Sequence, residues 1–447
     1  MDILVRVLQL VLCLSILVMV HELGHFMFAK MFGARVEKFY LFFNPYFSLF
    51  KKKIGDTEYG IGWVPFGGYV KIAGMIDESM DTEQMSGLPQ PWEFRSKPAW
   101  QRLLIMVGGV IMNVVLAFVI YVGLSFHYGE SYIAAADVKN GYSFSDLGHE
   151  IGFRDGDKIK TVNGKSFDNY VEIMSEIIIS GASEVEVERD GKSVIVSVDE
   201  EFTPRLLSGK QALFELRIPF TVDSVLTGSA AEKAGLAVGD SLLSVNGKRM
   251  FFRDQFVAAF RASAGDTLRL GVLRDSAGVT VARSLVLEVP EDGVIGTVSM
   301  TDILAYYPLT VRHYTFWESI PNGFKRAGEQ IGSYIKQLKL IVNPQTEAYK
   351  SVGSVVSMGK FFPTTWDWLR FWNITALFSI MLAVLNILPI PALDGGHVVL
   401  LLYEVITRRK PSDKFVMGAQ TVGMILLLLL LLLTLGNDII RLIFNRF

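Results

Sequence analysis

The sequence is poor in cysteine, histidine and charge. It has one cysteine, Cys13, and 6 histidines among 447 residues. One thiol excludes a disulfide framework, a zinc-finger array and an iron–sulfur site. Charged residues make up 20% of the chain and the formal net charge is −2, so no basic field would attract nucleic acid. Any metal site must therefore be built from very few positions.

Apolar residues are abundant instead: 51% of the chain is hydrophobic, and the mean hydropathy is +0.36. This balance excludes a disordered chain and argues against an ordinary soluble enzyme. Four stretches reach the roughly 20 apolar residues that a helix needs to cross a bilayer. They are found in residues 1–32, 99–126, 372–403 and 415–447. The first has no signal-peptide cleavage motif, so we expect it to be a retained transmembrane helix.

Between the second and third stretches, short β-like runs alternate with Gly, Asp and Asn turns. This region contains a repeat, because GFRDGDKIKTVNGK from Gly152 matches GLAVGDSLLSVNGK from Gly235 at an offset of 83 residues. We expect two tandem α+β domains, at 127–215 and 216–300, whose turn pattern resembles that of PDZ domains. The alternative is two unrelated β-rich domains that share common turn chemistry.

An amphipathic segment lies in residues 301–371, between the repeats and the third apolar stretch. Apolar residues recur there at near-helical spacing, which predicts a helix over 317–340. Lysines and arginines occupy other positions of the same segment. Two placements stay open for this helix, one on the membrane surface and one against the second β domain.

Basic residues in the loops predict how the chain is oriented in the membrane. The loop 404–414 carries Arg408, Arg409 and Lys410, and the segment 33–98 carries further lysines and arginines. Loops rich in Lys and Arg are retained in the cytoplasm. We therefore expect these two loops to be cytoplasmic, and the termini and the repeats to lie outside.

The first apolar stretch contains the run His21-Glu22-Leu23-Gly24-His25. Residues i and i+4 share one face of a helix, so both imidazoles can reach a single Zn²⁺ ion. Glu22 lies beside them, where it can take a proton from a water at the ion. A single histidine in a transmembrane helix often serves only to form a hydrogen bond with a neighbouring helix. Three ionisable residues within five positions of an apolar helix are costly unless they form a site.

Zinc in a catalytic site needs a third protein ligand and an open fourth position. The segment after the first stretch offers Glu37, Asp56 and Glu58, but in no distinctive context. A better candidate is Asp394 in NILPIPALDGGH, where two prolines break the third stretch and the freed backbone must line an enclosed or watered cavity. His397 is a rival ligand on spacing alone. The alternative is a kinked span in which Asp394 only caps the following helical segment.

These motifs resemble the site-2 protease family of intramembrane zinc metalloproteases, and especially its bacterial RseP-type members. The resemblance covers essentially the whole chain: HELGH in the first span, NILPIPALDGG in the third, and PDZ-like repeats between the second and third. It implies an α-helical polytopic membrane protein with four transmembrane helices and two inserted PDZ-like α+β domains. It also implies that His21, His25 and Asp394 are the ligands of a Zn²⁺ cofactor and that Glu22 is the general base.

The third-span motif carries further expectations. Asn386, Pro389 and Pro391 match the NxxPxPxLDG pattern, which in the family shapes the site and contacts substrate. The second span departs from the family pattern, because Gly108-Gly109 stands where Gly-Pro often precedes the asparagine, here Asn113. That departure concerns local geometry in the second span and not the metal ligands.

Residues 60–71, GIGWVPFGGYVK, resemble the family's membrane-associated β-hairpin. The segment is apolar and Gly-rich, and its edge can hold a substrate as an added strand. Such pairing matters because a helical substrate must unwind before water can attack its amides. Gly67, Gly68 and Tyr69 are therefore candidates for substrate contact. The alternative is a cytoplasmic hairpin with no role in substrate binding.

The sequence thus predicts a zinc metalloendopeptidase that hydrolyses peptide bonds within transmembrane segments of pre-trimmed membrane proteins. The resemblance implies a bacterial inner-membrane location, a site toward the cytoplasm, and repeats outside that act as a size filter. It implies single-span substrates such as an anti-sigma factor and leftover signal peptides, and no nucleic-acid partner. A membrane scaffold is one rival, which the intact Glu22 argues against. A metal transporter is the other, disfavoured because inverted span repeats are lacking.

Overall fold

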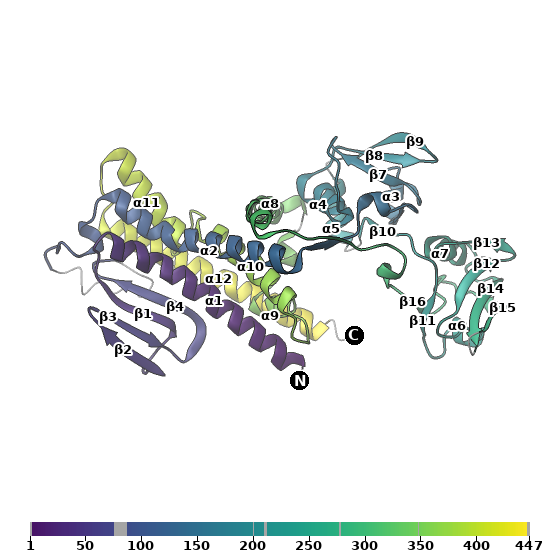
Figure 1. Cartoon of the computed structure of the whole chain (residues 1–447), viewed down its shortest axis with the longest axis horizontal. Helices are drawn as coiled ribbons and strands as arrows, with labels where there is room; N and C mark the ends of the chain where they lie inside the picture. The colour runs from purple at the N-terminus through teal and green to yellow at the C-terminus, as the bar shows by residue number, and fades with distance from the viewer. Residues whose placement is uncertain are drawn as a thin grey trace. The chain divides into compact units, whose positions relative to one another are not determined.

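The computed structural model describes residues 2–75, 87–199, 201–209, 212–276, 279–346 and 348–444. The chain forms two compact units (Figure 1). The first unit comprises residues 1–129, 313–342 and 349–447, and the second comprises residues 130–312 and 343–348. The apolar stretches belong to the first unit and the repeats to the second, and each unit has its own hydrophobic clusters.

The first unit is mainly helical. Its helices are α1 (Asp2–Met31), α2 (Ala99–Tyr128), α8 (Phe316–Val342), α9 (Val355–Gly359), α10 (Trp368–Asn386), α11 (Asp394–Thr407) and α12 (Asp413–Phe444). In the part of the chain that the structure describes, four helices are long and apolar enough to cross a bilayer: α1, α2, α10 and α12. The chain therefore has the four candidate spans of a polytopic membrane protein.

The third apolar stretch folds differently from the single interrupted span predicted over 372–403. Helix α10 begins earlier, at Trp368, and ends at Asn386, and α11 is a separate helix that begins at Asp394. Pro389 and Pro391 lie in the break between the helices. A proline has no amide hydrogen for the helical ladder and its ring clashes with the preceding turn, so a helix cannot continue through this pair.

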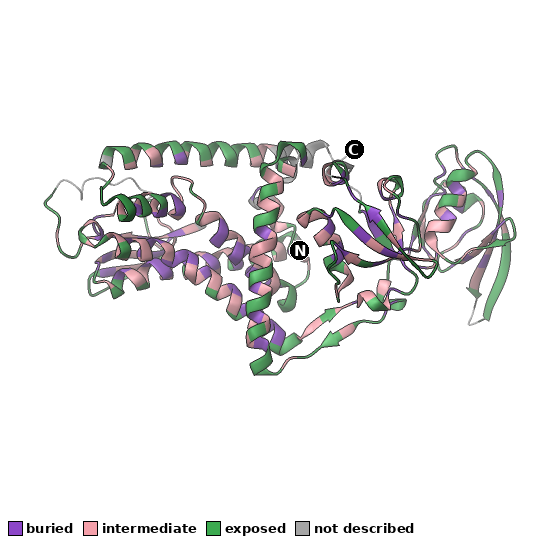
Figure 2. Ribbon diagram, turned by 90° about the horizontal axis from the view of Figure 1, so that it is seen from above, coloured by how far each residue is buried: buried purple, intermediate pink, exposed green. Residues whose placement is uncertain are grey.

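The spans pack through small residues. A Cβ atom on Gly24 of α1 would lie only 2.2 Å from the carbonyl oxygen of Gly108 in α2, so the two helices meet backbone to backbone. On α10, Ala376 and Ile380 join the cluster that α2 builds around Ala117. Helix α12 is different, because few of its residues are buried and most residues of its leucine run are exposed (Figure 2).

A four-stranded sheet lies beside α1 in the same unit (Figure 1). Its strands are β1 (Val36–Phe43), β2 (Phe50–Ile54), β3 (Thr57–Ile61) and β4 (Val64–Ile72), in the order β2-β3-β1-β4. The segment 60–71, expected as a hairpin, is not one, because β3 and β4 flank β1 instead of pairing with each other. The connection crosses the end of β1, where the amide of Gly62 donates to Leu41 and that of Trp63 to Phe43. Strand β4 is consequently an outer strand.

Helix α8 lies across the spans of its own unit (Figure 2). Its contacts within that unit are with α2 and α10. Ser319, Gly323, Ala327 and Tyr334 form the buried side of the helix. Trp317 and other large apolar side chains are exposed on another side. This pattern suits a helix that packs on the spans with one flank and leaves another open.

The second unit contains the two repeats. The first repeat has α3 (Asp146–Glu150), α4 (Tyr170–Ser180), α5 (Phe202–Gly209), β6 (Tyr142–Phe144), β7 (Lys158–Val162), β8 (Glu184–Arg189), β9 (Lys192–Ser197) and β10 (Phe214–Leu216). The second has α6 (Ala230–Lys233), α7 (Arg253–Ala262), β11 (Val222–Val225), β12 (Ser241–Val245), β13 (Lys248–Arg249), β14 (Thr267–Ser276), β15 (Val279–Glu288) and β16 (Thr297–Ser299). A ribbon of β5 (Glu130–Tyr132) and β17 (Thr310–Arg312) joins the two ends of the unit.

The two repeats have the same internal anchor. In the first, the buried carboxylate of Asp157 accepts from the guanidinium of Arg189 at 2.7 and 2.8 Å. In the second, Asp240 is buried and accepts from Arg274 at 2.6 Å through both oxygens. Bidentate pairs of this kind fix a turn against a strand. The sequence repeat is therefore also a structural repeat.

Candidate metal centre

The two histidines of HELGH lie one turn apart on α1 and point the same way. His21 and His25 are 8% and 6% exposed, and their Nε2 atoms are 3.2 Å apart. The helix is apolar on both sides of this turn, so the pair lies within a candidate span. As predicted from the i, i+4 spacing, one small ion can reach both nitrogens.

Asp394 joins the two histidines from α11. Its Oδ2 atom lies 3.2 Å from Nε2 of His21 and 3.4 Å from Nε2 of His25. Apart from these imidazoles, no polar group of the described residues bonds to this buried oxygen. The aspartate occupies the first position of α11 because the proline-broken segment ends there. That segment is held by α12, where a Cβ on Gly423 would lie 1.9 Å from the carbonyl oxygen of Pro391.

The three candidate ligand atoms have the spacing of a tetrahedral zinc site. Ligand atoms in a tetrahedron lie about 1.6 bond lengths apart, and Zn–N and Zn–O bonds of about 2.0–2.2 Å give about 3.3–3.6 Å. The observed separations are 3.2, 3.2 and 3.4 Å. Two imidazoles and one carboxylate are also a common donor set for catalytic zinc, which keeps a fourth position open. The residues present therefore fit the metal.

The other acidic candidates lie elsewhere. Glu58 accepts a hydrogen bond from the hydroxyl of Tyr40 at 2.7 Å, and the exposed Asp56 faces Arg35 at 3.7 Å. Glu37 is in β1, on the sheet. Within the described ranges, the one group that could hold a metal consists of the two histidines and the aspartate. None of the three alternatives in the loop belongs to it.

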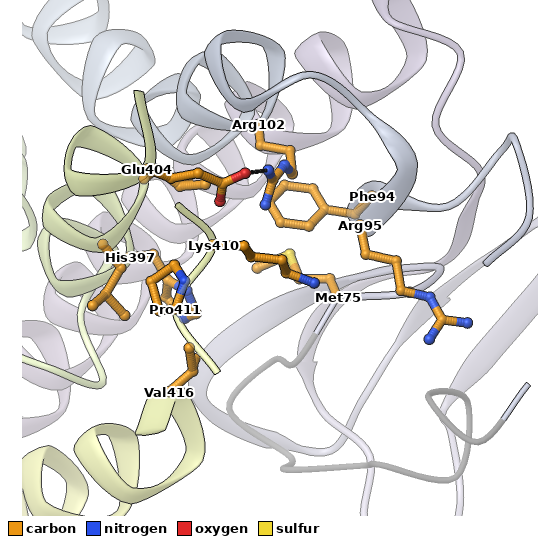
Figure 3. A pocket seen from close by; sticks show the side chains of 12 residues that line it. Met75, Phe94, Arg95, Arg102, His397, Glu404, Lys410, Pro411 and Val416 are labelled. Atoms are coloured by element: carbon orange, nitrogen blue, oxygen red, sulfur yellow. Dashed lines mark hydrogen bonds and ion pairs between the residues drawn. The ribbon is translucent and has the colours of Figure 1, made fainter. Parts of the chain in front are cut away.

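His397, the rival ligand, also lies outside this group. Its Nε2 is 2.6 Å from Nε2 of Gln420 on α12. It lines a pocket between α11, the start of α2, the segments 74–75 and 94–95, and the residues from Lys410 to Val416 (Figure 3). The same pocket is bordered by the ion pair of Arg102 with Glu404 and by Lys410. One turn of α11 thus separates the proposed ligand Asp394 from a mainly apolar pocket that has these charged groups on its border.

Glu22 faces the outer edge of the sheet. Its half-buried carboxylate accepts a hydrogen bond from the backbone amide of Val70 in β4. In β4, residues pair with β1 on one side, with Tyr69 opposite Tyr40 and Gly68 opposite Leu41. The amide of Val70 therefore points away from β1, and the outer edge of β4 runs beside the HELGH turn.

The remaining predicted site residues fall into two places. The amide Nδ2 of Asn386, the last residue of α10, lies 3.3 Å from Nε2 of His21, so this residue is brought to the centre. Pro389 and Pro391 lie in the break that leads to Asp394.

Gly67, Gly68 and Tyr69 are on β4. Gly68 packs on α1, where a Cβ would lie 2.8 Å from Val18, and the hydroxyl of Tyr69 donates to Asn44 at 2.9 Å. These residues are part of the strand next to Glu22.

Sequence reasoning did not identify the residues behind the imidazoles. Nδ1 of His25 lies 2.8 Å from the carbonyl oxygen of Ile105, and Nδ1 of His21 lies 3.3 Å from Nδ2 of Asn113. Every residue has a backbone carbonyl, so the sequence does not show which one a histidine contacts. An asparagine within an apolar span is a signal in the sequence, but the sequence does not show that it faces His21.

Comparison with known proteins shows the family of this chain. The profile of Peptidase family M50 matches residues 9–430. A Neisseria meningitidis protein whose name describes a zinc metalloprotease is 30% identical, over 98% of this chain and 99% of the relative. Protease RseP of Yersinia pestis is 28% identical over 99% of this chain and its whole length, and the regulator of sigma E protease of Haemophilus influenzae is 25% identical over 97% and 98%. The chain therefore belongs to peptidase family M50, the site-2 protease family, and is a membrane metalloprotease.

Proposed function

We propose that this protein is an intramembrane zinc endopeptidase, which cuts peptide bonds within the transmembrane segments of membrane proteins already trimmed outside. The observation that carries the proposal is the convergence of His21 Nε2, His25 Nε2 and Asp394 Oδ2 to within 3.2–3.4 Å. Two of these residues lie inside a candidate span and the third follows another. Polar residues at such depth mark functional sites, because they are costly anywhere else.

The chemistry divides between the ion and the chain. Zn²⁺ held by the three residues would supply a Lewis acid for the scissile carbonyl and would lower the pKa of a bound water to about 7. Glu22 accepts the proton of the attacking water and returns it to the leaving amine. Asn386, whose amide lies 3.3 Å from His21 Nε2, is placed to donate to the oxygen of the scissile carbonyl.

Substrate would bind along the outer edge of β4. An unwound segment that adds to this edge gains main-chain hydrogen bonds, which replace those lost when its helix opens. The amide of Val70 is bonded to Glu22, so a strand on this edge passes beside the general base. Gly68 lets β4 pack closely on α1, since a Cβ there would lie 2.8 Å from Val18, and Tyr69 is fixed by its bond to Asn44.

Water would reach the site from the pocket beside α11. Its lining is mainly apolar, but His397, Arg102, Glu404 and Lys410 contribute polar groups that can hold water (Figure 3). The break at Pro389 and Pro391 leaves backbone groups free, and these are tolerated in a bilayer only beside protein or water. Hydrolysis inside a membrane needs such a route.

The basic loops support a site near the cytoplasmic side of a bacterial inner membrane. Arg408, Arg409 and Lys410 are in the loop before α12, and Lys51–Lys53 are exposed on β2. Retention of such segments in the cytoplasm places the N-terminus, and the repeats after α2, outside. The PDZ-like repeats would then act as a filter that excludes substrates with large external parts. Single-span proteins such as anti-sigma factors and remnant signal peptides fit that filter.

The variant Glu22→Gln tests the function. We expect purified E22Q to keep its zinc and to lose cleavage of transmembrane peptides in liposomes by about 10²–10⁴-fold, because only the proton transfer is removed. Glu329→Gln, on the exposed face of α8, is the matched control and should cleave normally. A scaffold or transporter would be unaffected by E22Q, and full activity in this variant would refute the protease mechanism. Equal cleavage of full-length and trimmed substrates would refute the filter.

A further inference from the structure

One stripe of α2 forms the wall behind the two imidazoles. Ile105, Gly109 and Asn113 are spaced by four residues, so they share one face of the helix. The carbonyl oxygen of Ile105 and the amide of Asn113 lie against the two imidazoles, and Gly109 lies so close to them that a Cβ atom would not fit.

The bond to Ile105 fixes which nitrogen of His25 carries hydrogen. A carbonyl oxygen can only accept, so Nδ1 of His25, at 2.8 Å, is the protonated nitrogen. Nε2 is then free to donate its lone pair toward Asp394 and His21. Metal-binding histidines are generally oriented in this way, by an acceptor at the nitrogen that does not bind the metal.

His21 requires the same arrangement, and Asn113 is the group in position to supply it. The Nδ1 atom of His21 faces the amide of Asn113, while its Nε2 faces Asp394 at 3.2 Å. A histidine that binds metal through Nε2 carries its hydrogen on Nδ1. The amide end at 3.3 Å is the NH₂ group, also a donor, so in the metal-bound state two donors would face each other. The other end, Oδ1, is buried and has no hydrogen-bond partner among the described residues.

We propose that Asn113 is the positioning residue of His21. In the metal-bound protein its amide is turned by half a turn, so that Oδ1 accepts a hydrogen bond from Nδ1–H. The two ends of an amide have the same size, so the turn needs no repacking of a side chain that is 0% exposed. This assignment rests on the proposed zinc function. It deepens that function by giving each histidine ligand an acceptor on α2.

The test measures zinc affinity directly. The variants are Asn113→Leu, which keeps the shape and removes both polar ends, and Asn113→Asp, which keeps an acceptor. Gln9→Leu is the matched control, because Gln9 is a completely buried amide on α1 that bonds to the backbone of Val5 and Pro363. Full-length proteins in detergent compete for zinc with a chromophoric chelator. Cobalt-loaded protein gives a visible spectrum that reports ligand geometry.

We expect N113L to bind zinc about 10–100-fold more weakly than wild type and to change the cobalt spectrum. N113D should stay within a few-fold of wild type, and Q9L should bind normally. Wild-type affinity in N113L, or an equal loss in Q9L, would overturn the assignment. If N113L does not accumulate, N113D decides: a loss as large as that expected of N113L shows that the amide must donate and overturns the proposal. Zinc binding that survives His21→Ala would instead defeat the proposed metal centre itself, and the role of Asn113 with it.

Discussion

Gly109 is the position where a single methyl group should disrupt the metal centre. A Cβ atom there would lie 2.5 Å from Cε1 of His21, 2.6 Å from Nε2 of His25 and 2.7 Å from Nδ1 of His21. All three atoms belong to the proposed ligands, and one of them is a ligand atom. The change Gly109→Ala therefore acts on the imidazoles themselves and not on a distant contact.

The size of the effect follows from these distances. Carbon atoms in contact lie about 3.5–4.0 Å apart, so the imidazoles or α2 must move by roughly 1 Å. Metal–ligand distances tolerate about 0.2 Å. Loss of an outer partner of a ligand costs about 10–100-fold in metal affinity, and direct displacement of both histidines should cost at least the upper value.

The assay is zinc binding and peptide cleavage by full-length G109A in detergent, beside Gly123→Ala. Gly123 is on the same helix, but a Cβ there would meet nothing within 4 Å. Alanine is a better helix former than glycine, so G123A should be as stable and as active as wild type. If G109A binds zinc and cleaves as G123A does, α2 does not approach the histidines as closely as described, and the proposed back wall is refuted.

Two further predictions concern ionic contacts. In the second repeat, burial by itself raises the pKa of the Asp240 carboxyl, but hydrogen bonds from Arg274 and Ala237 outweigh it and the pKa is lowered. The stabilisation from the ionised Asp240 carboxylate should be complete above about pH 4 and should fade as the pH falls below that value. In pH-jump circular dichroism, Asp240→Asn should therefore reduce the acid dependence of unfolding. The change Asp223→Asn, at an exposed position, should not. Arg102→Met leaves Glu404 unpaired and should destabilise the detergent-solubilised protein by about 3–5 kcal/mol in thermal unfolding, and adding Glu404→Met should recover most of that loss.

The local parts of the site could be predicted from the sequence because helix geometry determines them. An apolar run of sufficient length predicts α1, and the spacing of His21 and His25 within it places both imidazoles on one face. The prolines before Asp394 predict the break in the third stretch, although not that α11 would be a separate helix. The repeat in the second unit is also local, because its turns recur at a fixed offset.

The other features depend on packing between distant segments, which no local pattern encodes. The segment 60–71 looks like a hairpin because two β-like runs flank a short turn, yet β1 lies between them. The parallel pairing of β1 with β3 is a long-range choice. Likewise Gly109 and Ile105 look like ordinary residues of an apolar helix. Their contact with the histidines depends on how closely α1 and α2 approach.

Helix α2 contacts each of the elements that contribute residues to the metal centre. Arg102 pairs with Glu404 of α11, the carbonyl of Ile105 accepts from His25, Gly109 makes room for both rings, and Asn113 meets His21. These positions are separated by three or four residues, so they lie along one face of α2. A rotation of α2 by a single residue would turn this face by about 100° and remove every one of these contacts together. The accuracy that a metal site demands is therefore met by the packing of three helices, since α2 fixes the donors on α1 and α11 relative to each other.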